Sequence, residues 1–186
     1  MATKRIFVSI DLPTSAKEEL RLRQKPEIRW IKWIKLDNLH ITLNFLGDLR
    51  EEQIETAKSV ILEVIPYYKS FKVSLIRTHA ERDMLWLVPA ENEALDKLRA
   101  ELKAKFKERR AGKRERRPYT AHILFAKSKT GRPMLWQPDK FEPIEFAVNK
   151  INLYESKLTP GAATHILMQS FDLSPALSPA PGERGG

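Results

Sequence analysis

Two short segments of the sequence resemble each other, and each carries one histidine. Residues 39–43 read Leu-His-Ile-Thr-Leu, and residues 121–125 read Ala-His-Ile-Leu-Phe. Both are apolar runs typical of strands, in which residues two apart share a face. His40 should therefore point the same way as Thr42, and His122 the same way as Leu124. Because imidazole titrates near neutral pH, two histidines facing one substrate could take up and release its protons. The Thr42 hydroxyl could hold a phosphoryl oxygen beside them.

The composition narrows the chemistry that these residues could perform. The chain has 186 residues, 42% of them hydrophobic, and no cysteine. Disulfides, thiolate metal sites and cysteine nucleophiles are therefore excluded. His79 and His165 have no partner at the spacing of metal ligands, so we predict structural roles for both. We expect no metal and no cofactor. The first apolar stretch is too short for a signal peptide and no run approaches a membrane span, so we expect a cytoplasmic protein and no membrane partner.

Positive charge is concentrated just before the second histidine. The formal net charge is +9, and residues 107–117 alone hold seven basic and two acidic residues. Such a run is either a solvated loop or frayed helix end, or a patch that attracts a polyanion with a phosphate backbone. Its place beside His122 favours the second interpretation.

The elements that must position the histidines alternate between strands and helices. Apolar periodicity predicts helices at 17–24, 51–65 and 91–107. Strands are expected at 6–10, 28–35, 71–78, 84–88, 141–154 and 164–173, besides the two that carry the histidines. This order predicts an α+β fold of two pseudo-symmetric lobes, each a curved and mainly antiparallel sheet with helices outside, around a central cleft. Residues 174–186 are rich in proline and glycine and are predicted to be a disordered tail.

From residue 5 to residue 173 the chain resembles the RNA 2′,3′-cyclic phosphodiesterase family, also called 2′-5′ RNA ligase-like, of the two-histidine phosphoesterases. The family signature is a repeated H-x-T-x motif. The resemblance also covers flanking segments at 5–13, 32–34, 38–47, 84–87, 117–122 and 153–161. It implies one bilobal domain over 1–173 and a monomer that acts on RNA, either single-stranded ends or tRNA fragments.

The implied reaction is metal-free opening of a terminal 2′,3′-cyclic phosphate to a 2′-phosphate, with 2′-5′ ligation as its reversal. By position, His40 is the general acid for the departing 3′ oxygen and His122 is the base that activates water. Thr42 and Lys127 are the implied phosphate-binding residues. On the face opposite Ile6, Phe7 could stack on a base, although simple packing is the competing interpretation.

The second motif departs from the family pattern. Leu124 replaces the expected threonine, and Lys127 stands where arginine is common. Leu124 cannot donate a hydrogen bond, and Thr120, on the same side of the strand as His122, could substitute for it. Strict alternation gives Lys127 the opposite parity from His122, so we expect it to reach the phosphate from the strand end.

Two alternatives remain open from the sequence. The chain could be an RNA-binding protein of the same fold with weakened or lost catalysis, as the replacement of the motif threonine by Leu124 would indicate. It could also be a phosphodiesterase of small cyclic nucleotides, although the basic run argues for an extended anionic partner.

Overall fold

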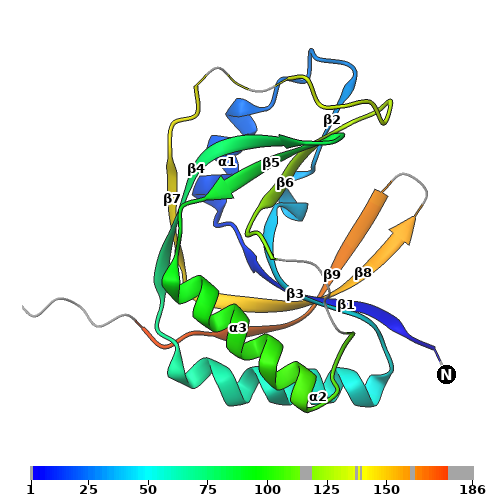
Figure 1. Cartoon of the computed structure of the whole chain (residues 1–186), viewed down its shortest axis with the longest axis vertical. Coiled ribbons are helices and arrows are strands. Elements are labelled where there is room, and N and C mark those ends of the chain that lie inside the picture. The colour runs from blue at the N-terminus through cyan, green and yellow to red at the C-terminus, as the bar shows by residue number, and fades with distance from the viewer. Residues whose placement is uncertain (1, 114–118, 137, 139, 160–161, 176–186) are drawn as a thin grey trace, which may run out of the picture.

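Two antiparallel sheets form the two halves of the molecule in a computed structural model that describes residues 2–113, 119–136, 138, 140–159 and 162–175. Figure 1 shows the sheets facing each other across the middle of the molecule. In the described part, the first sheet has the strand order β3-β1-β8-β9, and the second has the order β2-β6-β5-β4-β7. The strands are β1 (Lys4–Asp11), β2 (Ile31–Trp33), β3 (His40–Leu49), β4 (Phe71–Glu81), β5 (Met84–Pro89), β6 (Ile123–Ser128), β7 (Ile144–Val148), β8 (Lys150–Thr159) and β9 (Ala162–Asp172).

The helices cover the outer sides of the sheets. They are α1 (Thr14–Arg23), α2 (Glu51–Val64) and α3 (Glu93–Glu108), with short 3₁₀ turns at η1 (Leu36–Asn38) and η2 (Ile65–Tyr67). α1 packs against β7 of the second sheet, whereas α2 and α3 pack on each other and on β3 of the first. This arrangement confirms the predicted α+β fold of two lobes.

The predicted apolar stripes hold the helices in place. Ile54, Ala57 and Ile61 of α2 are buried, as are Leu95, Leu98, Leu102 and Phe106 of α3. The side chain of Asn92 caps α3 by accepting a hydrogen bond from the Leu95 amide at 3.0 Å. Buried residues of both lobes form one contiguous core, so the two sheets are fixed relative to each other.

Two of the predicted strands differ in the structure. The expected strand at 141–154 is divided, because β7 pairs with β4 in one sheet and β8 pairs with β1 and β9 in the other. The chain crosses between lobes at Asn149. The expected strand at 28–35 is reduced to β2, since a turn closed by the Ile31 amide on the Ile28 carbonyl occupies its start.

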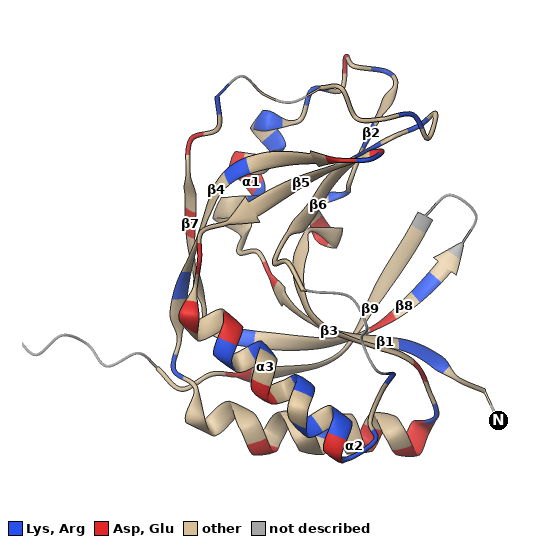
Figure 2. Ribbon diagram, in the orientation of Figure 1, with Lys and Arg blue, Asp and Glu red and all other residues tan. Residues whose placement is uncertain are grey.

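The basic run and the tail are described only in part. Figure 2 shows Lys and Arg along the end of α3, where Arg109 pairs with Glu63 at 3.1 Å and Lys113 with Asp48 at 3.1 Å. Residues 114–117 of the run and 176–186 of the tail lie outside the described residues. Ser174 forms a bridge with Lys69, so ordered pairing reaches one residue beyond the expected boundary. Within the described ranges, no helix is long and apolar enough to cross a membrane.

Candidate active site

His40 is the first residue of β3, and a backbone contact fixes its ring. Its Nδ1 lies 2.8 Å from the carbonyl oxygen of Asn38, the last residue of the 3₁₀ turn η1. A carbonyl oxygen can only accept, so Nδ1 must carry the proton of this hydrogen bond. The other ring nitrogen, Nε2, is then the atom that can exchange a proton with a substrate.

His122 repeats this arrangement just before β6. Its Nδ1 lies 2.8 Å from the carbonyl oxygen of Thr120, again two residues earlier. The same argument assigns the proton to Nδ1 and leaves Nε2 for chemistry. The resemblance between the two sequence segments therefore extends to the orientation of the rings.

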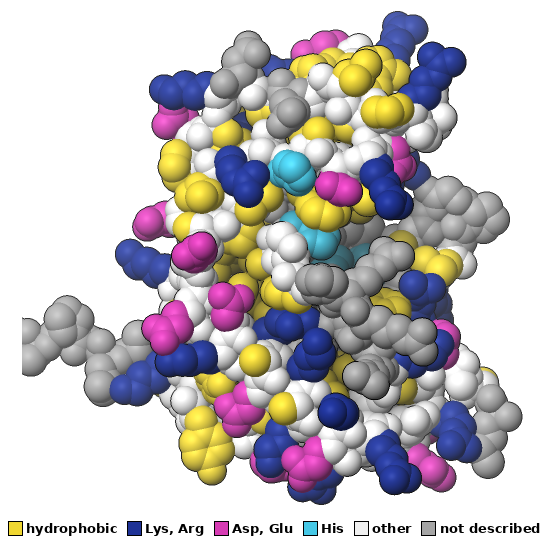
Figure 3. Space-filling model, in the orientation of Figure 1, with side chains coloured by type: hydrophobic (Ala, Val, Ile, Leu, Met, Phe, Trp, Pro, Cys, Tyr) yellow, Lys and Arg dark blue, Asp and Glu magenta, His cyan; other side chains and the backbone are white. Residues whose placement is uncertain are grey.

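The alternation expected around both histidines is present. Ile41 and Leu43 are fully buried, as is Ile123, whereas Thr42 and Leu124 are partly exposed. β3 and β6 belong to different sheets but lie in contact. Figure 3 shows histidine side chains gathered near the middle of one face, between the two halves.

The electrostatic surroundings of His40 disfavour its charged form. Burial, with smaller contributions from the charges of His165 and His122, lowers the pKa of His40 to about 4. The Asn38 carbonyl and the carboxylate of Asp11 act in the opposite direction but are outweighed. The influence of His122 on this pKa indicates that the two imidazoles share one electrostatic environment.

An aromatic cluster packs around His40. The Phe7 ring centroid lies 5.0 Å from that of His40, and the His165 ring lies 5.2 Å from His40 at 90°. Phe7 also stacks on Tyr154 at 5.4 Å and meets His165 at 4.9 Å. Phe7 is only 3% exposed, so the proposed stacking on a base is not supported by its position. The ring is covered by its neighbours and packs against that of His40.

Asp11 is the centre of a hydrogen-bond network beside this cluster. Its Oδ2 accepts from the Tyr154 hydroxyl at 2.5 Å and from Asn152 Nδ2 at 2.8 Å. Its Oδ1 accepts from the Ser9 hydroxyl at 3.3 Å. Burial and the bond to Asp11 raise the pKa of Tyr154, which keeps this hydroxyl a donor. Asp11 is directly opposite His40 in the β1–β3 register, so the network anchors the strand position next to the imidazole.

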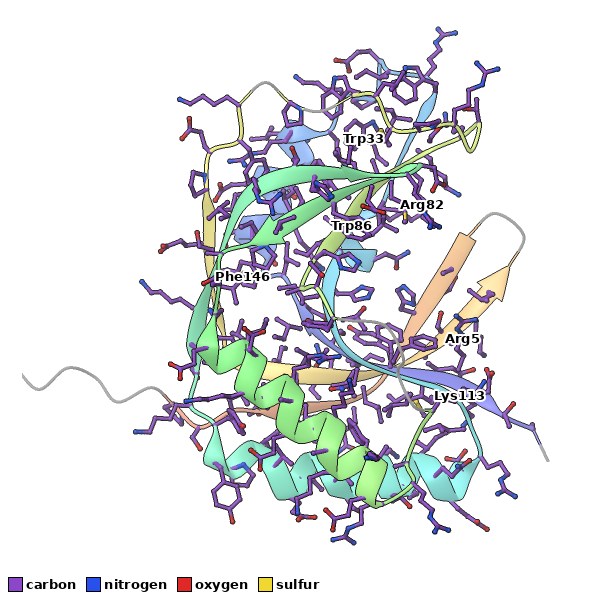
Figure 4. All side chains as sticks on the ribbon, in the orientation of Figure 1. Arg5, Trp33, Arg82, Trp86, Lys113 and Phe146 are labelled. Carbon is purple, nitrogen blue, oxygen red and sulfur yellow. The ribbon has the colours of Figure 1, made fainter. Side chains whose placement is uncertain are left out.

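His122 packs against a tryptophan from the neighbouring strand. The rings of Trp86 and His122 stack with centroids 4.1 Å apart and planes 19° apart. Figure 4 shows Trp86 on the inner side of its sheet, toward the other lobe. Leu124 is directly opposite Trp86 in the β5–β6 register. Leu124, at the position of the expected threonine, therefore forms an apolar surface together with Trp86.

Thr42 and Thr120 are held in different ways. The Thr42 carbonyl accepts a hydrogen bond from the Tyr119 hydroxyl at 3.0 Å, which ties the segment before His122 to β3. The Arg99 guanidinium lies 3.8 Å from the centre of the Tyr119 ring and stabilises this link between the lobes. Thr120 is exposed, and its carbonyl orients His122. Phosphate binding by either hydroxyl stays a prediction.

Lys127 does not have the parity that strict alternation predicted. In the β5–β6 pair Trp86 is opposite Leu124, but Leu85 is opposite Ala126, so Phe125 is an extra residue that forms a β-bulge. Phe125 and Ala126 are both buried, and Lys127 returns to the exposed side. Because the bulge resets the alternation, Lys127 shares the face of His122 and Leu124.

Three residues beside the histidines were not predicted as part of the site: Asp11, Trp86 and His165. The first two reach the histidines through cross-strand pairing, which no sequence motif encodes. His165 was predicted to be structural, yet its ring packs against that of His40. Its Nδ1 is buried without a partner in the described part of the chain. Within those same ranges, no three His, Asp or Glu side chains are grouped as metal ligands.

Comparison with known proteins identifies the family of this chain and agrees with its two-lobe fold. Residues 15–159 match the 2′-5′ RNA ligase superfamily. An RNA 2′,3′-cyclic phosphodiesterase of Methanocaldococcus jannaschii is 26% identical over 177 residues, which cover 90% of this chain and 99% of that protein. One from Bacillus subtilis is 29% identical over 137 residues, covering 67% and 72%. The structure of E. coli LigT complexed with 3′-AMP superimposes with a TM-score of 0.76 at 20% identity, covering 92% and 98%.

Proposed function

Because the chain belongs to the 2′-5′ RNA ligase superfamily, we propose that it is an RNA 2′,3′-cyclic phosphodiesterase. The observation that carries the proposal is the pair of similarly oriented imidazoles, each with Nδ1 bound to a carbonyl and Nε2 left for a substrate. The full-length relatives that bear this activity in their names support it.

The reaction needs two proton transfers at one phosphorus centre. The neutral imidazole of His122 takes a proton from water, whose oxygen bonds to phosphorus. The bond from phosphorus to the 3′ oxygen breaks, and the imidazolium of His40 gives that oxygen its proton. The product carries a 2′-phosphate and a 3′-hydroxyl. Each positioned acid or base contributes roughly 10²–10⁴ in rate. In the reverse direction a 5′-hydroxyl end joins through a 2′-5′ bond.

The low pKa of His40 bears on its role as the acid. In the free protein His40 is neutral near pH 7, since burial lowers its pKa to about 4. The negative charge of a bound cyclic phosphate favours the imidazolium form. We therefore infer that His40 takes up its proton together with the substrate. The Thr42 hydroxyl, on the same face, donates to a phosphoryl oxygen.

The direct test is hydrolysis of a labelled oligonucleotide that ends in a 2′,3′-cyclic phosphate, with EDTA present. We expect a 2′-phosphate product, identified against 2′- and 3′-phosphate standards. His40→Ala and His122→Ala should each lower kcat by at least about 10²-fold. His79→Ala is the matched control, because His79 is an exposed histidine on β4. A chelator-sensitive reaction, or variants as active as the parent, would contradict the mechanism.

A second candidate function is RNA binding with lost catalysis, and Leu124 is the observation that favours it. Leu124 is partly exposed opposite Trp86 and offers no hydroxyl to a phosphate. In that case the parent and His40→Ala would both bind cyclic-phosphate RNA, and neither would release product. Turnover by the parent above that of His40→Ala decides in favour of the enzyme.

A further inference from the structure

A pocket lies between the end of α3 and β3, the edge strand of the first sheet. Its volume is about 370 Å³, within the range of small-ligand sites. Among the described residues that line it are two phenylalanines and four basic side chains but no acidic one: Phe45, Phe106, Lys103, Lys107, Arg110 and Lys113. A lining of aromatic and cationic side chains fits a ligand that has an aromatic ring and a negative charge.

One face of β3 leads from the first histidine to this pocket. Thr42 and Asn44 are opposite consecutive residues of β1, so Leu43 is an extra residue that forms a β-bulge. Leu43 and Asn44 are both buried, and Phe45 returns to the face of His40 and Thr42, where it is 38% exposed. The Cα atoms of His40 and Phe45 are roughly 13 Å apart at about 3.3 Å per residue, with the bulge not counted.

A buried amide borders the pocket. Asn44 is 4% exposed, and its Oδ1 atom has no hydrogen-bond partner among the described residues. Buried polar atoms are normally paired, so this oxygen is available to an N–H group of a ligand. The amino groups of nucleobases are donors of this kind. The amide therefore indicates a ligand independently of the basic side chains.

Arg5 and Phe45 form a stacked pair beside the pocket. The guanidinium carbon of Arg5 lies 4.7 Å from the centre of the Phe45 ring, and both side chains are exposed. Unpaired RNA bases stack on aromatic rings and on guanidinium planes. Asp48, the register partner of Arg5, pairs with Lys113 at 3.1 Å, which brings Lys113 close to this pair (Figure 4). A bound phosphate would take the place of the Asp48 carboxylate on Lys113.

Backbone geometry positions two of the basic residues. The Lys113 amide donates to the Leu46 carbonyl at 2.9 Å, and the Lys113 side chain crosses Gly47, where an added Cβ would lie 2.8 Å from its Cδ. Arg110 follows the last turn of α3 with a φ of 55°, a conformation that glycine adopts more readily. The chain thus has an arginine beside the pocket where glycine would be less strained.

We propose that this pocket is a second RNA subsite, which binds a nucleotide of single-stranded RNA upstream of the cyclic end. The base of that nucleotide lies against Phe45 with an N–H group toward Asn44, and its phosphate lies among Lys107, Arg110 and Lys113. A nucleic-acid strand advances about 3.4 Å per stacked nucleotide, so the roughly 13 Å from the histidine corresponds to about four nucleotides. This inference rests on the proposed function, and it specifies an oligonucleotide as the substrate in place of a mononucleotide.

The test compares two substrates that share the reacting end. One is adenosine 2′,3′-cyclic phosphate, and the other is an oligoadenylate of about eight residues with the same terminus, long enough to reach the pocket. The readout is kcat/KM for the oligonucleotide divided by kcat/KM for the mononucleotide. Lys107→Ala should lower this ratio roughly 3- to 10-fold at low salt and make the salt dependence of the oligonucleotide reaction shallower by about 0.7 in logarithmic slope. Phe45→Leu should lower the ratio at least about fivefold through lost stacking.

Arg110→Gly separates RNA binding from folding. Glycine adopts a φ of 55° without strain, so the free energy of unfolding in urea should not decrease. The activity ratio should nevertheless fall as it does in Lys107→Ala, because one phosphate contact is lost. A purely structural role of Arg110 would give the opposite result, a less stable protein with an unchanged ratio.

A lysine at the other end of the same helix provides the control for charge. Lys97→Ala removes an exposed lysine from the beginning of α3 and should leave the ratio unchanged. An unchanged ratio in Lys107→Ala and Arg110→Gly, or an equal fall in Lys97→Ala, would overturn the subsite. If the parent hydrolyses neither substrate, the proposed function fails. The subsite is then judged by anisotropy of a labelled oligoadenylate with a 2′-phosphate end, which Arg110→Gly should bind more weakly than the parent. Equal binding would overturn it.

Discussion

Each of the two motif histidines presents the same ring nitrogen, because a backbone carbonyl two residues earlier takes the other. This local hydrogen bond orients the ring without the help of a second side chain. The differences between the two rings come from their surroundings. His40 packs among Phe7 and His165, whereas His122 stacks on Trp86. Two chemically equivalent residues are thereby placed in unequal environments, as an acid–base pair requires.

The pH dependence of stability should report the burial of His40. Its pKa is about 4 in the folded protein and about 6.5 when unfolded, so the unfolded chain binds more protons between these values. The contribution of His40 to the free energy of unfolding is therefore fully present above about pH 6.5. It is lost as the pH decreases toward 4, by about 3 kcal/mol. Urea unfolding at pH 7 and pH 4 measures this difference.

The variant His40→Gln isolates this contribution. Its loss of stability between pH 7 and pH 4 should be about 3 kcal/mol smaller than that of the parent, because glutamine does not titrate. His79→Gln, which replaces an exposed histidine, should behave like the parent. An undiminished loss in His40→Gln would show that His40 takes up its proton as readily in the folded chain as in the unfolded one.

Leu124 allows a gain-of-function prediction. Leu124→Thr should raise kcat/KM on the cyclic phosphate at least about tenfold, because a hydrogen bond to a charged group contributes about 1.5–3 kcal/mol. Leu124→Val is the control, since valine has the shape of threonine without its hydroxyl. Equal rates for the two variants would mean that position 124 makes no hydrogen bond to the phosphate.

Among the elements, β6 is the one whose irregularity shapes the site. Its single extra residue, Phe125, turns both Phe125 and Ala126 toward the core and returns Lys127 to the face of His122. The buried Phe125 ring meets Trp33 edge to face at 5.1 Å. Packing on the core side of β6 therefore fixes which side chains lie on the side that carries His122.

Removal of the Phe125 ring should be costly. We expect Phe125→Ala to lower the free energy of unfolding by about 3–5 kcal/mol, because Phe125 is 2% exposed and its loss leaves a cavity. Leu135→Ala, at a side chain that is 87% exposed, should change it by less than about 0.5 kcal/mol. Urea denaturation measures both. A cost below about 1 kcal/mol for Phe125→Ala would mean that the bulge is not anchored by this ring.

At the scale of the whole molecule, the C-terminal segment is held by hydrogen bonds to segments that connect the two lobes. Leu173 is 5% exposed, and its amide donates to the Asn149 carbonyl at 2.8 Å, where the chain crosses between the sheets. The Ser174 amide donates to the Tyr68 carbonyl at 3.1 Å, and the Ser70 amide donates to the Ser174 carbonyl at 2.8 Å. These contacts extend the fold past the end of β9.

Two truncations should therefore behave differently. A chain that ends at Asp172 loses the burial of Leu173 and three backbone hydrogen bonds, so its free energy of unfolding should fall by about 2–4 kcal/mol. A chain that ends at Pro175 retains them and loses only the proline- and glycine-rich tail. Its stability should match that of the full chain within about 0.5 kcal/mol. Equal stability of the two truncated chains would show that the contacts of residues 173 and 174 contribute nothing.

The sequence alone was sufficient for the features that depend on neighbouring residues. Periodicity located α2 and α3 with their buried stripes, and the repeated motif identified His40 and His122 as residues facing away from the core. Such patterns are local, because strand and helix geometry fixes which nearby residues share a face. The family resemblance added the expected reaction.

Only the tertiary structure decided the features that depend on pairing between distant strands. It divided the expected strand at 141–154 between two sheets, covered Phe7, and placed Trp86 and His165 against the two histidines. It also brought Lys127 to the face of His122 through a one-residue bulge. Register and bulges are set by which side chains fill the shared core, and that packing joins residues far apart in the chain.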